Sequence, residues 1–266
     1  MNISIPRNLV ITTILLFIFS NPILSQKREP NDRIIEPDHT IQSKIMGKEY
    51  QLYISFPKNY STKDSLSYPV LYVLDGRYSF PTINAARTAM DWGKELEDII
   101  IVGIGTGLDF NSWYFNRYHD YTTSIDTTFQ KEKEQYYGFT KGSLKSGGAD
   151  RFLESIKKEI APFVDKNYKT NSDRGLTGHS FGGLFTAYCF VNSDGYFTRF
   201  GINSPSLSWD NKLLQEQSVS QFIENKTWDL PPTKVYISVA ENDPAKTVST
   251  ANGGANNQII QPSIKT

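Results

Sequence analysis

The order of apolar and polar residues separates strands from helices along most of the chain. Two alternating runs on either side of Gly47 predict an antiparallel hairpin within residues 41–57. Two continuous apolar runs, YPVLYVLDG at 68–76 and DIIIVGIG at 98–105, predict strands that are buried on both faces. Between these strands, a proline at the start and a glycine at the end mark a predicted helix over residues 81–93.

The second half of the chain continues this exchange of helix and strand. Apolar residues recur at three- and four-residue steps in residues 147–168, which predicts a helix. The further predicted elements are, in chain order, a strand at 174–179, a helix from the next turn to about 191, a strand and loop at 197–206, a polar helix at about 211–225, and a strand with an acidic turn at 233–244. Strands that alternate with helices after a hairpin predict an α/β fold, with a mostly parallel central sheet, an antiparallel edge and helices on both faces.

Residues 106–148 interrupt this alternation with a long, aromatic and irregular segment. Connections of this length in compact domains are usually functional or disordered. We interpret the segment as a loop that shapes a pocket, in which Trp113, Tyr114 and His119 are candidate substrate contacts. A simple packed loop, with His119 exposed at the surface, is the alternative.

The N-terminal residues have the pattern of a secretory signal peptide. Arg7 precedes an apolar run at 9–19, which is shorter than the roughly 20 residues of a membrane-spanning helix. Small and polar residues follow, and they place a cleavage site after Ser25, so that residues 1–25 form the signal peptide. An uncleaved anchor is the alternative, and either one exports the rest of the chain to the periplasm or the medium.

Composition narrows the classes of partner. The 28 basic and 28 acidic side chains balance, so no general attraction to nucleic acid or to acidic membranes is expected. No membrane contact is expected beyond the signal peptide. The single cysteine, Cys189, cannot form an internal disulfide and is interpreted as a buried, inert thiol. A chain of 266 residues suits one large domain or two small ones, and its oligomeric state is left open.

The stretch GLTGHSFGGLFTAYCF places a serine between an apolar strand and an apolar helix. Gly178 and Gly182 flank Ser180 in the G-x-S-x-G pattern, where side chains two positions from the serine would collide. Such a turn exposes the serine oxygen at the helix N-terminus, and the N–H of Phe181 can donate to an oxyanion. The pattern predicts that Ser180 is a nucleophile. A glycine-rich turn without catalytic function is the alternative.

A serine nucleophile needs further groups, which should follow other strands of the sheet. The backbone N–H of Arg77, after the strand at 68–76, is the candidate second oxyanion donor. A plain turn stabilised by Asp75 explains the same residues equally well. The acidic turn after the last strand offers Glu241 and Asp243 as the carboxylate that orients a histidine. A solvated acidic turn is the alternative there.

The chain has three histidines, and none of them follows Ser180. His179 precedes the serine directly, so its side chain should point away from the serine oxygen. His119 lies in the long loop, where a role as base is a further alternative, and His39 lies in the polar leader and is expected at the surface. No histidine, cysteine or aspartate cluster has metal-ligand spacing and no phosphate-binding loop is present, so neither a metal nor an organic cofactor is implied.

These motifs together resemble the putative-esterase family of the α/β-hydrolase superfamily, and most of all its siderophore-esterase-like members. The resemblance runs from about residue 50 to residue 244, through YPVLYVLDG, IIVGIG, GGADRFLESIKKEIAPFVDKNYKT, GLTGHSFGGLFTAY, INSPSLSWDN and VYISVAENDP. It implies an α/β-hydrolase domain over residues 26–245 that acts on a small-molecule ester. It also implies Ser180 as nucleophile, Phe181 and Arg77 as oxyanion amides, and Asp243 rather than Glu241 as the acid.

The C-terminal tail departs from the family pattern. The family has a histidine a few tens of residues beyond the acid and then a last helix, but residues 246–266 contain no histidine and no helical periodicity. We therefore expect an irregular tail, produced by truncation or a frame shift. In subtilisin, loss of the base costs on the order of 10⁶ in kcat, so turnover without a histidine should be weak.

The sequence thus predicts an exported serine ester hydrolase that works through an acyl-serine intermediate. An acyltransferase that passes the acyl group to a sugar or lipid alcohol is one alternative. A non-catalytic binding protein or a vestigial hydrolase is the other.

Overall fold

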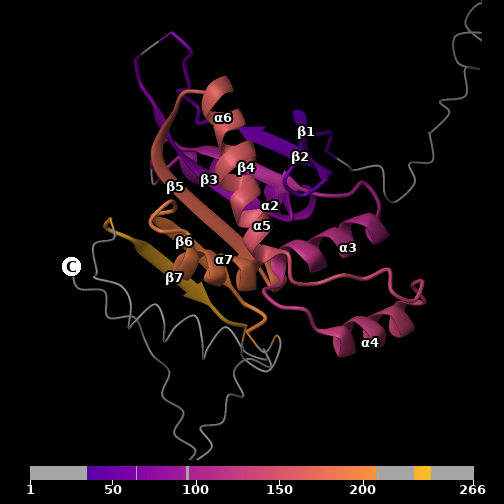
Figure 1. The fold of residues 1–266 in the computed structure, drawn as a ribbon. Helices are drawn as coiled ribbons and strands as arrows, with labels where there is room; N and C mark the ends of the chain where they lie inside the picture. The colour runs from indigo at the N-terminus through magenta and orange to yellow at the C-terminus, as the bar shows by residue number, and fades with distance from the viewer. Residues whose placement is uncertain (1–34, 64, 94–95, 208, 210–230, 241–266) are drawn as a thin grey trace, which may run out of the picture. The chain divides into compact units, whose positions relative to one another are not determined.

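A twisted sheet forms the centre of the described part of the computed structural model, where seven strands lie in the order β1-β2-β4-β3-β5-β6-β7 (Figure 1). The strands are β1 (His39–Ser43), β2 (Lys48–Ser55), β3 (Tyr68–Leu74), β4 (Ile100–Gly105), β5 (Thr170–His179), β6 (Arg199–Asn203) and β7 (Lys234–Ser238). β2 pairs antiparallel with both β1 and β4, and the other neighbours pair parallel. The predicted hairpin and the mostly parallel sheet are confirmed.

The structure describes residues 35–63, 65–93, 96–207, 209 and 231–240, all within one compact unit that begins at residue 35. Several sequence predictions lie outside these residues. They are the signal peptide at 1–25, the polar helix at 211–225, the acids Glu241 and Asp243, and the tail at 246–266. Among the described residues, no helix has the length and the apolar character needed to cross a membrane.

Helices cover both faces of the sheet, as predicted. Successive side chains of a strand point to opposite faces, and β3 shows the two environments. Tyr72 belongs to the larger core cluster together with Phe152 and Ile156. Val73 belongs to a smaller cluster together with Phe80, on the other face. The first cluster lies beneath the helix at 149–167 and the second beneath the helix that follows β3.

The helix predicted over residues 147–168 is present in three consecutive parts. α5 (Ala149–Ser155) and α6 (Ala161–Asn167) are joined by a π-helical turn, η1 (Ile156–Ile160). The apolar residues that predicted this helix are buried against the sheet, and Ile156 and Ile160 are fully inaccessible to solvent. The periodic pattern therefore identified the correct face.

The helix after β3 starts earlier than predicted. α2 (Gly76–Asp91) begins directly after the strand, so Pro81 lies inside the helix rather than near its start. The backbone of Asp75 is in the left-handed region, with φ 52°, and this residue alone turns the chain from strand into helix. Because the turn is a single residue, no stretch of polar loop residues marks the start of the helix in the sequence.

The interpretation of residues 106–148 as an irregular loop is wrong, because the segment contains two helices. These are α3 (Phe110–Tyr121) and α4 (Thr127–Tyr137), which lie together beside the C-terminal ends of the parallel strands (Figure 1). Asp109 caps α3 in a reciprocal capping box with Ser112, and Asp126 caps α4 through the amides of residues 128 and 129. These two capping residues are visible in the sequence and mark the starts of both helices. The many aromatic residues of the segment favoured the interpretation as a loop instead.

Candidate active site

Ser180 occupies the turn that connects β5 to the helix α7 (Phe181–Asn192). Its backbone has φ 59° and ψ −116°, a conformation that residues other than glycine rarely adopt. Residues are held in such conformations mainly at functional sites, where the surrounding structure compensates for the strain. The strand–turn–helix context predicted for Ser180 is therefore present.

Close approach of backbone explains two of the glycines around the serine. A Cβ atom on Gly178 would lie 2.4 Å from the carbonyl carbon of Gly182, and one on Gly183 would lie 2.7 Å from the Asn203 carbonyl oxygen. A Cβ atom on Gly182 itself would meet only ordinary contacts, at 3.5 Å or more. Of the two glycines in the G-x-S-x-G pattern, Gly178 is the one that space requires.

The segment after β6 borders the serine on its other side. The Ser180 N–H donates to the Asn203 carbonyl at 3.1 Å, and the Ser206 N–H donates to the Ser180 carbonyl at 3.1 Å. The hydroxyl oxygens of Ser180 and Ser206 are 3.3 Å apart. Sequence reasoning did not identify Ser206, although it stands in the SPS stretch that follows a predicted strand.

The two predicted oxyanion amides stand at the starts of neighbouring helices. Phe181 is the first residue of α7 and Arg77 is the second residue of α2. β3 and β5 are adjacent parallel strands, so both helices start at the same edge of the sheet. The first amides of a helix have no acceptor within it, and the helix dipole adds positive potential there. An anion placed between these two N–H groups would be stabilised.

Asp75 is a buried ion-pair partner, and its side chain does not cap α2. Its carboxylate accepts hydrogen bonds from Arg117 Nε at 2.9 Å, from Arg117 Nη2 at 3.0 Å and from Trp113 Nε1 at 3.0 Å. Its own N–H donates to the hydroxyl of Tyr121 at 3.0 Å. The Asp75 side chain therefore does more than stabilise a plain turn, because it binds Arg117 and Trp113. Sequence reasoning did not identify Arg117 as a residue of this region.

Arg117 remains charged despite its burial. Desolvation opposes the guanidinium charge, but the charge and the hydrogen bonds of Asp75 outweigh it, so the pKa of Arg117 is raised. The guanidinium carbon also lies 5.0 Å from the Trp113 ring centroid and 5.5 Å from that of Phe181. Arg117 thus contacts residues from both sides of the predicted oxyanion site.

The three predicted substrate contacts lie in different surroundings on α3. Trp113 is next to the site, because it hydrogen-bonds Asp75. Tyr114 is only 8% exposed and packs in an aromatic cluster over α7. His119 is on another side of α3, where its Nδ1 is 2.9 Å from Asp120 Oδ1 and its ring lies against Gly148. Among the contacts of the described residues, none joins His119 to Ser180.

Among the hydrogen bonds of the described residues, none joins either of the other two histidines to the Ser180 hydroxyl. His179 is the last residue of β5, and its side chain is exposed. His39 is the first residue of β1, is partly buried, and has its Nε2 2.5 Å from the Tyr168 hydroxyl. The expectation that His39 is a surface residue of a polar leader is wrong.

Exposed aromatic rings continue from the site along α3 and α4. Tyr78 follows Arg77 and packs edge-on against Trp113, with 4.8 Å between the ring centroids. Phe110 lies 5.7 Å from Trp113 and 6.2 Å from Tyr137 by the same measure. Tyr78, Phe110 and Tyr137 are all more than 40% exposed. We name Tyr78, Trp113, Phe110 and Tyr137 the aromatic row.

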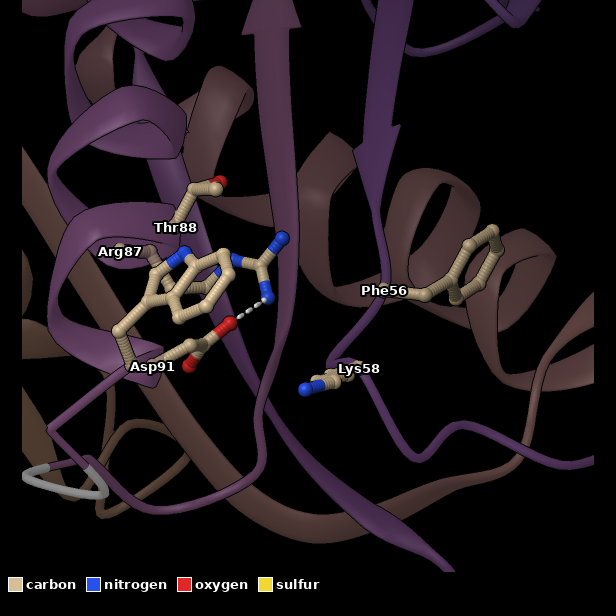
Figure 2. A pocket seen from close by; sticks show the side chains of 6 residues that line it. Phe56, Lys58, Arg87, Thr88 and Asp91 are labelled. Carbon is tan, nitrogen blue, oxygen red and sulfur yellow. Dashed lines mark hydrogen bonds and ion pairs between the residues drawn. The ribbon is translucent and has the colours of Figure 1, made fainter.

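A separate pocket lies at the other end of α2 (Figure 2). It is lined by Phe56, Lys58, Arg87, Thr88, Asp91 and Trp92. Its Arg87 is already paired with Asp91, with 2.8 Å between Nη1 and Oδ2. Ten residues of helix, about 15 Å at 1.5 Å per residue, separate Arg87 from Arg77. The pocket is therefore distinct from the turn that carries Ser180.

The chain is similar to a known protein family and to individual known proteins. Residues 43–259 match the model of the Esterase family, whose description is "Putative esterase". The chain is 30% identical to the apo-salmochelin esterase of Escherichia coli over 161 residues. This matched region covers 60% of this chain and 48% of that protein. It is 26% identical to the ferri-bacillibactin esterase of Bacillus subtilis over 207 residues. This second matched region covers 76% of this chain and 68% of that protein.

Solved structures share the fold. The BES protein from Bacillus cereus superimposes with a TM-score of 0.61 and 30% identity, over 77% of this chain and 73% of that one. An IroE-like serine hydrolase from Shewanella oneidensis gives a TM-score of 0.61 at 24% identity, over 78% and 62% of the two chains. The match to the salmochelin esterase spans about half of that relative's length. Because the family model covers most of the sequence, the chain belongs to the Esterase family, on an α/β-hydrolase fold.

Proposed function

We propose that the protein hydrolyses carboxylic esters through an acyl intermediate on Ser180. The observation that carries the proposal is the position of Ser180, in a positive-φ turn between β5 and α7. The neighbouring strand, β3, leads to Arg77. The Ser180 oxygen attacks the ester carbonyl, and the resulting oxyanion accepts hydrogen bonds from the amides of Phe181 and Arg77. The ester C–O bond breaks and the alcohol leaves with a proton. Water then cleaves the acyl-serine to release the acid.

We propose a small-molecule ester as the substrate, with siderophore esters as the class to test first. The curated relatives named above are siderophore esterases, which supports this class. The aromatic row offers exposed ring faces and edges beside the site, and aryl groups pack well on such surfaces. Export by the predicted signal peptide at 1–25 would bring the domain to substrates outside the cytoplasm.

The proton-transfer groups are assigned from the sequence. We propose Asp243 as the acid that orients a base, in the position that the family pattern implies. Loss of the base costs on the order of 10⁶ in kcat in subtilisin, where roughly 10³–10⁴ over water remains. The rate of turnover therefore measures whether a base reaches Ser180.

A covalent probe and a chromogenic ester test the proposal together. A fluorophosphonate should add one adduct to the intact protein, and p-nitrophenyl acetate should be hydrolysed. Ser180→Ala should abolish both, whereas Ser193→Ala, at the far end of α7, should change neither. Turnover that survives Ser180→Ala would contradict the assignment of the nucleophile.

Three further measurements separate the alternatives. Transfer of the acyl group to an added alcohol, in preference to water, would identify an acyltransferase. His179→Ala should leave turnover unchanged because its side chain is exposed. His119→Ala should alter stability more than rate, because its ring contacts Asp120 and Gly148. Loss of turnover on the order of 10⁶-fold in His119→Ala would instead make that histidine the base.

A further inference from the structure

We propose that Arg117 and Asp75 form a positioning pair that sets the separation of the two oxyanion amides, Arg77 and Phe181. The proposal rests on the proposed function of the site. It assigns a role to Arg117, a residue of α3 that carries no reacting atom. The pair would act by fixing the geometry of the backbone.

The first half of the argument concerns the side of the site that Arg77 occupies. The Asp75 carbonyl accepts the N–H groups of Tyr78 and Ser79, each at 2.9 Å, so the orientation of Asp75 sets the first turn of α2. Arg77 lies within that turn. Asp75 has a left-handed backbone, a sparsely populated conformation that contacts with the surrounding structure must maintain. Arg117 holds the Asp75 side chain with two parallel hydrogen bonds, the arrangement that best fixes the plane of a carboxylate.

The second half concerns the side that Phe181 occupies. The Arg117 guanidinium carbon is 5.5 Å from the centroid of the Phe181 ring, within the range of a cation–π contact. Tyr118, the next residue of α3, packs edge-on against the same ring at 5.5 Å. A Cβ atom on Gly182 would lie 3.5 Å from Asp75 Oδ2, so the first turn of α7 passes close to the Asp75 carboxylate. One guanidinium therefore contacts Phe181 directly and reaches the turn of Arg77 through Asp75.

The geometry of Arg117 explains why a smaller cation would not suffice. A lysine ammonium is a single point charge, whereas the planar guanidinium binds a carboxylate along one edge and presents its flat face to aromatic rings. Here the forked hydrogen bonds point to Asp75, and rings of Trp113 and Phe181 lie within 5.5 Å of its carbon. The pair is buried, with 10% of the Arg117 side chain and 9% of the Asp75 side chain exposed. Water can therefore not replace the missing bonds in a variant.

Arg117→Met is the variant that tests the pair in the full chain. A displacement of about 1 Å at a reacting centre can cost about 10²-fold in rate, so kcat for p-nitrophenyl acetate should fall by about that factor. KM should change little, because an ester carbonyl in the ground state gains less from the amides than the oxyanion does. Arg117→Lys should recover part of the loss, since it keeps the charge without the fork.

Arg87→Met is the matched control, because Arg87 is a similarly buried arginine in another ion pair. Arg87 is 9% exposed and Arg117 is 8% exposed, and Arg87 pairs with Asp91 near the C-terminal end of α2 (Figure 2). Both variants should melt at a lower temperature. If only Arg117→Met loses kcat, the effect is one of positioning and not of general stability. Equal kcat in the two variants would overturn the proposal.

Hydrogen exchange gives a readout that needs no activity. In Arg117→Met, amide exchange should accelerate in residues 76–80 and in residues 181–185, and in Arg87→Met neither segment should change relative to the wild-type protein. If the wild-type protein hydrolyses no ester but exchange responds in this way, the proposed function fails and the positioning pair stands. Unchanged exchange in both segments of Arg117→Met would overturn the pair whatever the activity.

Discussion

Ser180 keeps a backbone conformation that favours glycine, and the residues around it show how. Its N–H is hydrogen-bonded to Asn203, the last residue of β6, and its carbonyl to Ser206, which follows that strand. Gly178 leaves space for the backbone of Gly182 to approach. The pattern G-x-S-x-G identified the serine from local sequence alone. Only the structure shows that Gly178 has no space for a side chain whereas Gly182 has, because this space depends on how α7 packs over β5.

This inequality leads to a prediction for two alanine substitutions. Gly178→Ala should destabilise the protein by about 1–3 kcal/mol, as expected when an atom is forced into a packed interior, and should slow labelling by a fluorophosphonate. Gly182→Ala should cause a much smaller loss, because its added Cβ meets only ordinary contacts. Thermal melts and labelling rates of the two variants check this. Equal losses would show that α7 does not approach β5 as described.

At the scale of helices and strands, periodic apolar patterns predicted most elements correctly. The two helices that these patterns did not predict are marked in the sequence by the capping residues at their N-termini. The helix over 147–168 was visible because its apolar residues recur on one face. α3 and α4 were missed because aromatic and polar residues mix on their surfaces, and only Asp109 and Asp126 mark their starts. The pairing of Asp75 with Arg117 could not be predicted, since these residues lie 42 positions apart and meet only through the packing of α3 on α7.

The contact between η1 and the N-terminal hairpin gives a prediction about acid. Glu159 accepts hydrogen bonds from the hydroxyls of Ser43 and Ser155 and from the amides of Lys44 and Ile45. Burial raises the pKa of Glu159, but these hydrogen bonds outweigh it, so the pKa lies below the usual value of 4.5. A carboxyl group with a lowered folded-state pKa stabilises the fold above its unfolded-state pKa, and the stabilisation is lost as the pH falls through the folded value.

Glu159→Gln should therefore lower the melting temperature at neutral pH and reduce its dependence on pH below about 4.5. In a domain of 150–250 residues, each kcal/mol lost lowers the melting temperature by about 2–4 °C. Glu154→Gln is the control, because Glu154 forms an exposed pair with Lys158 on the same helix. The same acid dependence in wild-type and Glu159→Gln protein would contradict the assignment.

At the scale of the whole molecule, the order of strands and helices in the sequence predicted the fold. It did not predict where α3 and α4 pack against the rest of the domain. β3 and β4 are central because both of their faces are apolar, and the sequence shows that directly. Where α3 and α4 would pack depended on contacts between aromatic rings far apart in the chain, such as Tyr118 with Phe181. No periodicity within a single segment reports such contacts.

Cys189 offers a measurement of the stability of the whole domain. It is fully buried in the larger core cluster, and burial raises the pKa of its thiol well above the usual value. A thiol reagent should therefore not modify the native protein, even at mildly alkaline pH, and should modify it quantitatively in denaturant. The labelling rate in increasing urea should follow global unfolding. Rapid labelling under native conditions would show that α7 separates from the sheet without unfolding.

The position of Arg117 also limits how the protein can be modified by exchange of parts. Residues 106–148 border the site through the aromatic row, so they are the natural segment to replace when a different selectivity is wanted. The same segment supplies Arg117 and Trp113, which hold Asp75 and with it the first turn of α2. A segment transplanted from a relative would have to bring an equivalent arginine and tryptophan in register, or the recipient would gain a new binding surface and lose its rate. Under the proposed function, selectivity and catalysis are therefore not separate modules in this protein.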